Sequence, residues 1–250
     1  MKKALFLSIL CVVLLSARTI VYDQTYTGEG QRLYDKAQRG VLFTGEVRFY
    51  YSDGKLKEQC GYKAGIKEGH SIVWHKNGTK KEEGKYLHGK KEGKFTRWYT
   101  NGQKRSEIMF HNGKRDGVTK LWYKTGEKQL IYHFSNGRYD GENRSWYKNG
   151  QIKEITHYRN GSKEGAYLYY SKEGRPLEKA TFKHHKKEGL HQMWYDNGQM
   201  KVEHRFKNGV LEGRERIWFP NGQLQHDVVF RNGERQSGGH YWQENGKQIK

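Results

Sequence analysis

A 24-residue period runs through the chain and constrains its fold more than any other feature. All seven tryptophans lie on one series with steps of 24 or 48 residues: Trp74, Trp98, Trp122, Trp146, Trp194, Trp218 and Trp242. Tyr50 and Tyr170 stand at the two open positions of that series, and a glycine follows every member four residues later. Such a strict period indicates an array in which each unit packs mainly against its neighbours.

One unit, Gly93 to Asp116, shows that the array is built from strands. Two Asn-Gly pairs, Asn101-Gly102 and Asn112-Gly113, separate segments that are rich in aromatic and β-branched residues and contain no proline. Asn-Gly readily adopts positive φ and favours hairpin turns, whereas a glycine every few residues interrupts a helix. We therefore predict two antiparallel strands per unit, with a tight turn at the first pair and a longer connection at the second.

These units predict an all-β fold, an elongated single-layer antiparallel β-meander of tandem 24-residue β-hairpin repeats. About nine units occupy residues 41–250, and residues 18–40 form an N-terminal cap or a degenerate repeat. Composition agrees with a thin structure, because 34% hydrophobic residues are too few for one deep core. A disordered chain is excluded by the 14% of aromatic residues, since disordered chains contain few of them.

The first seventeen residues have the pattern of a secretory signal peptide. A basic start is followed by an apolar stretch from Ala4 to Leu15 and by the small residues Ser16-Ala17. We predict cleavage near Ala17 and export to the periplasm, the cell surface or the medium, with an uncleaved anchor as the alternative. The mature chain would keep one cysteine, Cys60, which excludes an internal disulfide and which we expect to be buried.

Side chains alternate between the two faces of a strand, so Trp98 and Tyr99 should point in opposite directions. We predict that the tryptophan series forms a structural ladder on one face. The opposite face would carry a tyrosine column suited to contacts with a protein partner, namely Tyr99, Tyr123, Tyr147 and Tyr195.

The chain is strongly basic, with a formal charge of +20. Part of this charge lies in cationic pairs at the connections between units, which we expect along one long edge: Lys90-Lys91, Lys114-Arg115 and Lys186-Lys187. A field of this sign attracts anionic membranes and polysaccharides.

No pattern of catalytic or metal-binding residues emerges. The histidine sets, His184, His185 and His191 together with His133 and His157, lack the paired spacing of a zinc site. An acid precedes the unit glycine in seven connections, at Glu68, Glu92, Asp116, Asp140, Glu164, Glu188 and Glu212. Because every unit repeats it, we interpret this acid as a turn residue that pairs with nearby Lys90, Lys91, Lys114 or Arg115. We expect no enzymatic activity, metal or cofactor.

The segment Gly141–Gly150 reads Gly-x4-Trp-Tyr-x-Asn-Gly, and Tyr158-Arg159-Asn160-Gly161 follows it. This unit resembles the MORN repeat, in its variant or second type, and the resemblance covers residues 41–250. It implies an elongated, twisted or curved β-sheet that serves as a binding scaffold for membranes or proteins. Some similar bacterial proteins are YwqK-like antitoxins.

We therefore predict a non-catalytic exported repeat scaffold that binds another protein through an extended sheet surface. Two alternatives remain: electrostatic binding to an anionic membrane lipid or surface polysaccharide, and neutralisation of a toxin by an antitoxin-like or immunity-like protein. We expect no nucleic-acid partner, although aromatic and basic residues alternate as they do in single-strand binders.

Overall fold

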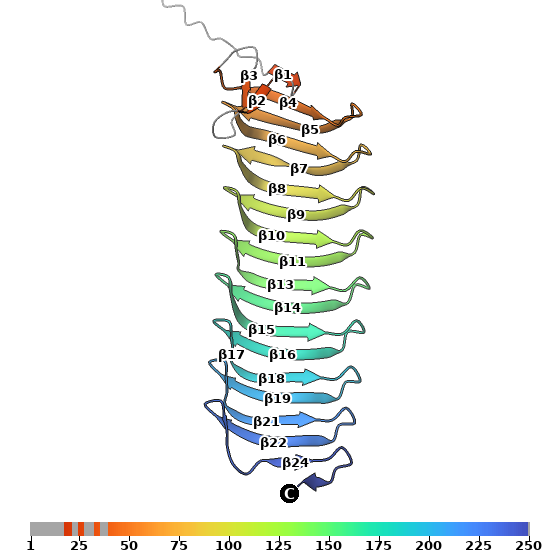
Figure 1. The fold of residues 1–250 in the computed structure, drawn as a ribbon, viewed down its shortest axis with the longest axis vertical. Helices are drawn as coiled ribbons and strands as arrows, with labels where there is room; N and C mark the ends of the chain where they lie inside the picture. The colour runs from red at the N-terminus through yellow and green to blue at the C-terminus, as the bar shows by residue number, and fades with distance from the viewer. Residues whose placement is uncertain (1–17, 22–24, 28–32, 36–39, 250) are drawn as a thin grey trace, which may run out of the picture.

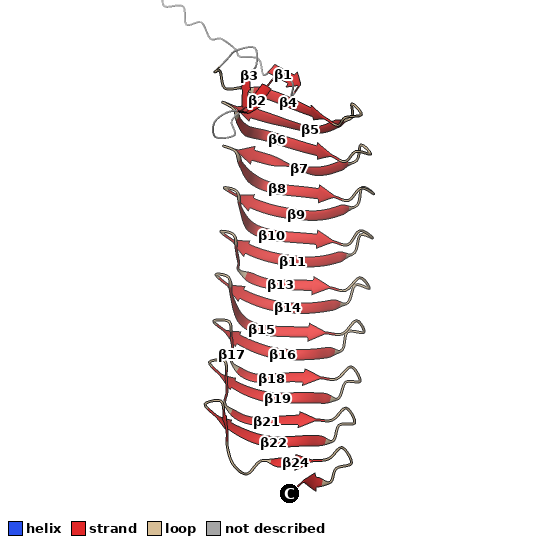
Figure 2. Cartoon of the chain, in the orientation of Figure 1, coloured by secondary structure: helices blue, strands red, loops and turns tan. Residues whose placement is uncertain are grey.

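The fold is one long ladder of strands (Figure 1). The structure is a computed structural model and describes residues 18–21, 25–27, 33–35 and 40–249. Every regular element in these ranges is a strand, as Figure 2 shows. The predicted signal peptide, residues 1–17, lies outside the described residues.

The strands are short and evenly spaced along the chain. Their bounds are β1 (Arg18–Val21), β2 (Thr25–Thr27), β3 (Leu33–Asp35), β4 (Gly45–Tyr50), β5 (Leu56–Lys63), β6 (Ile66–Trp74), β7 (Lys80–Leu87), β8 (Lys90–Trp98), β9 (Lys104–His111), β10 (Lys114–Trp122), β11 (Lys128–Ser135), β12 (Arg138–Tyr139), β13 (Gly141–Trp146), β14 (Ile152–Arg159), β15 (Ser162–Tyr170), β16 (Pro176–Lys183), β17 (Lys186–Lys187), β18 (Gly189–Trp194), β19 (Met200–Lys207), β20 (Val210–Leu211), β21 (Gly213–Trp218), β22 (Leu224–Arg231), β23 (Glu234–Arg235), β24 (His240–Trp242) and β25 (Gln248–Ile249).

One 23-stranded sheet contains all of them except the small β2–β3 hairpin. From β4 onward the strands pair antiparallel along the chain, which confirms the predicted meander of hairpin repeats. Short strands such as β12 share one partner with the strand that follows, because β12 and β13 both pair with β11. Outside that order, β1 pairs parallel with β4. Leu33 packs with Phe43 and Val47 in a buried cluster at this end, so β3 covers the first unit.

The two Asn-Gly turns of a unit differ, and the sequence-based assignment of the tight turn is wrong. Asn112 and Gly113 both have positive φ, 52° and 82°, and they join the paired residues His111 and Lys114. This is the two-residue turn that suits a right-twisted hairpin, and it connects successive units. The register shifts between Arg115 and Thr119 within β10, so the predicted long connection is a continuous strand with a bulge.

The first pair, Asn101-Gly102, lies in a longer loop between the paired residues Trp98 and Lys104. Only Gly102 has positive φ there. The Asn101 side chain accepts the backbone N–H of Gln103 at 3.2 Å and donates to the carbonyl of Lys124 at 3.1 Å in the next unit. Asn101 therefore links two loops instead of closing a tight turn.

The core is a single row that runs along the sheet on one face. It consists of residues paired across each hairpin, such as Val47 with Cys60 and Phe95 with Ile108, and all four are buried. Cys60 is fully buried, as predicted, and burial raises the pKa of its thiol. We call this side the aromatic face, because it also carries Tyr62, Tyr86, Phe110, Phe134, Tyr158, Phe182, Phe206 and Phe230. The opposite side is the tryptophan face.

Candidate functional site

The tryptophan face carries the predicted tryptophan series, and all seven indole side chains are half-buried. A lysine lies between two successive rings in part of the column: Lys80 is paired with Trp74 in register and lies 5.9 Å from the ring centroid of Trp98. Lys104 likewise lies 6.0 Å from the ring centroid of Trp122. Cation–π contacts therefore link successive units at Trp98 and Trp122. Further along the column, Trp146, Trp194 and Trp218 are paired with the apolar residues Ile152, Met200 and Leu224.

A groove of about 560 Å³ lies on this face around Trp98. Exposed Lys85, Lys94 and Lys104 line it together with half-buried Glu83 and Glu107. Lys104 bonds Glu107 at 2.7 Å and lowers the pKa of that carboxyl. Lysines and carboxylates are thus interspersed around a half-exposed indole.

The tyrosine column has a structural use that sequence reasoning missed. The hydroxyls of Tyr99 and Tyr123 donate to the backbone carbonyls of Trp122 and Trp146 at 2.9 and 2.8 Å. Tyr147 donates to the carbonyl of Tyr170 and Tyr195 to that of Trp218, both at 2.8 Å. Each half-buried ring therefore joins its own loop to the next one, and its role in partner binding stays a prediction.

Tyr123→Phe should lower the free energy of unfolding by about 1 kcal/mol, since it removes one hydrogen bond and leaves a carbonyl without that partner. Denaturant unfolding followed by circular dichroism measures the loss. Tyr241→Phe is the control, because the Tyr241 hydroxyl makes no hydrogen bond to another loop among the described residues. Equal losses in both variants would contradict this role for the column.

The cationic pairs at the connections are split between two environments. Lys90, Lys114 and Lys186 are exposed along one edge, and Lys90 Nζ donates to the Asn112 side chain at 3.0 Å. Their neighbours turn onto the aromatic face, where Lys91, Arg115 and Lys187 lie 4.2, 5.3 and 5.5 Å from the ring centroids of Phe95, Phe134 and Phe206. Only one cation of each pair therefore lies along the edge, where two were expected.

The recurring acids do not pair with those lysines, so our interpretation of them was wrong. Six of the seven carboxylates, all except that of Asp116, instead accept the backbone N–H of the residue 20 positions later, which begins the next tight turn. The bonds are Glu68–His88 at 2.7 Å, Glu92–Asn112 at 2.8 Å, Asp140–Asn160 at 3.3 Å, Glu164–His184 at 2.9 Å, Glu188–Asn208 at 2.7 Å and Glu212–Asn232 at 2.7 Å. A turn residue with positive φ directs its backbone N–H toward the preceding connection. A carboxylate can accept this hydrogen bond, whereas a lysine ammonium has no acceptor atom.

These bonds predict a loss of stability in acid. The backbone N–H groups of Asn112 and His184 lower the carboxyl pKa of Glu92 and Glu164 from the ordinary value of 4.5. Because the folded pKa is the lower one, the stabilisation is complete above pH 4.5 and is lost as the pH falls through the folded values. Melting temperatures between pH 7 and pH 3 should fall below about pH 4.5. A Glu92→Gln/Glu164→Gln variant should lose less on acidification, and an identical loss would contradict the assignment.

A chain of histidines and carboxylates on the aromatic face was missed in the sequence. His191 is buried, approaches Glu178 at 2.9 Å and stacks on His204 with ring centroids 5.6 Å apart. Glu215, one period after His191, lies 2.6 Å from His204 and 2.9 Å from His226. Burial is the largest cause of the lowered pKa of His204. The 24-residue period relates His191 to Glu215 and Glu178 to His226, but only the strand pairing brings these residues and His204 together.

The predicted histidine sets form no shared metal site within the described residues, although His133 and His157 both contact Glu142. His184 and His185 occupy the tight turn that Asn-Gly forms elsewhere, with φ of 50° and 64°. His133 and His157 bond the carbonyls of Glu142 and Ala166, respectively. No cluster of three or more His, Cys, Asp or Glu side chains within the described ranges could hold a metal ion. Those ranges also contain no helix long and apolar enough to cross a membrane.

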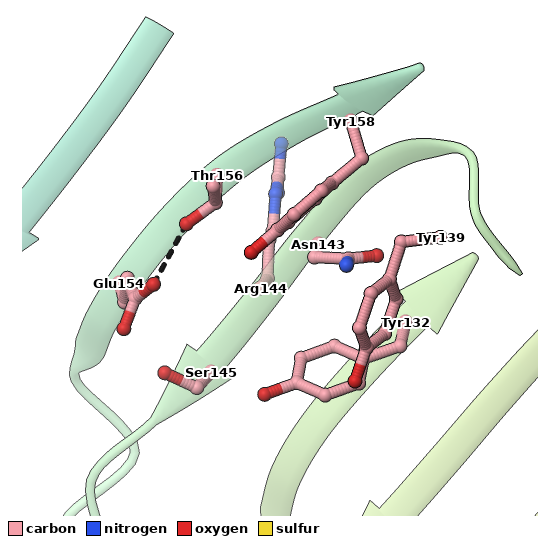
Figure 3. A pocket seen from close by; sticks show the side chains of 8 residues that line it. All are labelled: Tyr132, Tyr139, Asn143, Arg144, Ser145, Glu154, Thr156 and Tyr158. Atoms are coloured by element: carbon pink, nitrogen blue, oxygen red, sulfur yellow. Dashed lines mark hydrogen bonds between the residues drawn. The ribbon is translucent and has the colours of Figure 1, made fainter. Parts of the chain in front are cut away.

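A second, smaller hollow opens on the aromatic face between β11 and β14 (Figure 3). It encloses about 60 Å³. The rings of Tyr132, Tyr139 and Tyr158 stand around the buried Asn143, and Glu154 lies across from them.

Comparisons with known proteins identify the repeat. A family model described as the MORN repeat variant matches residues 43–64, 91–112, 139–160, 187–208 and 211–232. No curated protein matches the chain. Two similar solved structures are the crystal structures of TcdB2-TccC3 and of TcdB2-TccC3-Cdc42, at 11% and 12% identity and a TM-score of 0.23 each. Both matches cover 87% of this chain and 16% of the other, so the chain spans about a sixth of their length.

Proposed function

This chain belongs to the MORN repeat variant family, and from that premise we propose that it is a non-catalytic exported scaffold that binds another protein through the tryptophan face. The groove around Trp98 carries the proposal. It places a half-exposed indole among exposed lysines and half-buried carboxylates over about 560 Å³. Aromatic anchors surrounded by polar groups are typical of protein interfaces.

Exposed apolar side chains on the same face support a protein partner. Leu87 and Met109 are 41% and 38% exposed, and strand alternation directs both to the side of Lys85 and Glu107. On the aromatic face, by contrast, most lysines and aromatic rings already contact one another.

The charge pattern favours a protein over an anionic polymer. Lys80 and Lys104 bond Glu83 and Glu107 at 3.0 and 2.7 Å, which offsets the positive field of the groove. Along the edge, Lys90, Lys114 and Arg138 follow one another, but Ser162 and Val210 interrupt the series. A long polyanion would therefore find only short cationic stretches.

Site-specific photo-crosslinking in the native cell tests this function. A crosslinking residue at Lys94 should capture one protein species, and Lys85→Glu/Lys104→Glu should abolish that capture. The matched control carries the crosslinker at Lys114 on the edge and should capture none. Capture that survives the groove substitutions, or salt-sensitive binding to anionic vesicles with no protein captured at Lys94, would overturn the proposal. A toxin as the captured protein would identify the toxin-neutralising form of this function.

Export has its own test. Mass spectrometry of the chain recovered from the cell envelope or the medium should show a new N-terminus near Arg18. A full-length chain confined to the cytoplasm would contradict export.

A further inference from the structure

The hollow at Asn143 exists because two adjacent residues of the core row are small. Asn143 and Thr156 are paired across their hairpin, whereas the same positions hold Phe95 with Ile108 and His191 with His204 in other units. The Asn143 side chain is held in place, because its Oδ1 accepts the backbone N–H of His133 at 2.8 Å. At Asn143 and Thr156 the side chains of the core row are therefore too small to fill the space between the surrounding side chains.

Three tyrosines wall this space. Tyr139 packs edge-on against Tyr132 with ring centroids 5.4 Å apart and lies 5.0 Å from the centroid of Tyr158. In Figure 3 these rings surround Asn143, with Glu154 and Thr156 opposite. Burial is the largest cause of the raised hydroxyl pKa of Tyr132 and Tyr158, and the charge of Glu154 adds to it.

Glu154 differs from the carboxylates at the same position in other units. Glu58, Glu82 and Glu178 each meet a lysine from nine residues later, at Nζ–Oε1 distances of 2.5, 2.9 and 3.5 Å. The lysine nine residues after Glu154 is Lys163, which lies instead 5.1 and 5.2 Å from the ring centroids of Tyr167 and Phe182. Within the described part of the chain Glu154 forms no ion pair, and its only hydrogen bond is from Thr156 Oγ1 at 2.7 Å.

The other charged groups near the hollow are engaged elsewhere. Arg144 also lines the hollow (Figure 3), but its guanidinium is engaged by the Glu142 carboxylate, with Nε and Oε1 2.5 Å apart. Arg115 lies over Phe134. A half-buried carboxylate and three aromatic rings therefore share a small space in which, among the described residues, no cation of the chain is paired with Glu154.

Other units show what such a space accommodates. Lys91 Nζ lies 2.9 Å from the Glu82 carboxylate and 4.2 Å from the ring centroid of Phe95, so the scaffold itself holds an ammonium between a carboxylate and a ring. Tyr139 stands at the repeat position of Lys91 and Lys163. It adds a ring to the hollow and removes the lysine that this position supplies elsewhere.

We infer that the hollow formed by Tyr132, Tyr139, Tyr158, Asn143 and Glu154 is a binding site for an alkylammonium group. Ring faces attract cations, and the attraction is larger when the cation is partly desolvated. A carboxylate adds a charge-assisted hydrogen bond. The volume of about 60 Å³ is several times the roughly 10–15 Å³ that one water molecule requires, so the site takes the ammonium end of a longer group. The site lies on the aromatic face, so it does not depend on the proposed docking of a protein on the tryptophan face.

Titration of the full chain with n-butylammonium chloride tests the inference. The side-chain amide resonance of Asn143 should shift in a saturable manner, while sodium butyrate at the same ionic strength should leave it unchanged. Glu154→Gln keeps the shape of the site and should weaken binding by about tenfold or more. Glu142→Gln, a matched substitution one hairpin strand away on the other face, should bind normally.

A second variant keeps the test decisive if Glu154→Gln unfolds the hairpin. Tyr139→Lys restores the residue found at this position in other units and should block the site with an internal ammonium, while the melting temperature is kept. Absence of a saturable shift, an equal shift with butyrate, or full binding by Tyr139→Lys would overturn the inference.

Competition then distinguishes the sources of the group. Displacement by Nα-acetyl-lysine methylamide would support a lysine side chain of a partner, and displacement by vesicles containing phosphatidylethanolamine would support a lipid headgroup. Failure of both to displace n-butylammonium would contradict a role for the site in binding either source.

Discussion

Phe95→Ala should lower the free energy of unfolding by about 3–5 kcal/mol, the usual cost of deleting a fully buried phenyl ring. Phe95 is only 1% exposed. Its ring packs edge-on against Tyr86 and Phe110, at centroid distances of 5.5 and 5.3 Å. Because a single-layer sheet has no second layer to close the cavity, neighbouring units would lose these contacts together. Denaturant unfolding followed by tryptophan fluorescence measures the effect.

Met109→Ala is the matched control, since Met109 lies on the next strand but is 38% exposed. It should cost less than about 1 kcal/mol, as surface substitutions usually do. A loss for Phe95→Ala no larger than that of the control would contradict a core one residue wide.

Gly84 provides a further check on this core. A Cβ at Gly84 would lie 2.5 Å from the Phe95 ring, so the glycine makes room for the ring. Gly84→Ala should therefore destabilise the wild-type chain clearly more than the Phe95→Ala chain, which a double-mutant cycle measures. Additive effects would contradict this packing.

Thr119→Val should stabilise the protein, in contrast to Phe95→Ala. We expect the free energy of unfolding to rise by about 1–3 kcal/mol, the cost of leaving a buried polar group unsatisfied. Thr119 is 2% exposed, and its hydroxyl has no hydrogen-bond partner among the described residues. Its cross-strand neighbours are Ile108 and Tyr132, and the equivalent residue of the first unit is the fully buried Val47. Valine keeps the branched shape and removes the hydroxyl.

Thr156→Val is the control for this prediction, because Thr156 is equally buried but donates to Glu154 at 2.7 Å. The same substitution should therefore destabilise the protein at residue 156. Melting temperatures of the two variants should move in opposite directions. A shift in the same direction would show that burial alone, without the hydrogen bond, determines the effect.

The fold could be predicted from the sequence because every unit carries the same local information. The in-phase glycines and Asn-Gly pairs indicate turns, and the aromatic segments between them indicate strands, so the meander follows without tertiary data. Burial of Cys60 was predictable as well, since cysteine is among the residue types most often fully buried.

The details of the turns and of the site required the structure. Local preference does not tell which Asn-Gly pair is tight, because Asn101 is engaged by the carbonyl of Lys124 in the next unit. The acid at Glu92 likewise finds its partner 20 residues away, at the backbone N–H of Asn112. The partners of the tyrosine hydroxyls and the environments of the cationic pairs likewise depend on residues that are distant in the sequence.

The sequence by itself determined what is common to all units: the strand-turn pattern, the number of repeats and the assignment of side chains to two faces. Only the tertiary structure decided what depends on contacts between neighbouring units. The hollow at Asn143 illustrates the difference, because no single deviation from the repeat forms it. It arises where small Asn143 and Thr156, the exchanged Tyr139 and the unpaired Glu154 meet. A period describes the average unit, whereas a binding site is formed where adjacent units deviate from that average at the same place.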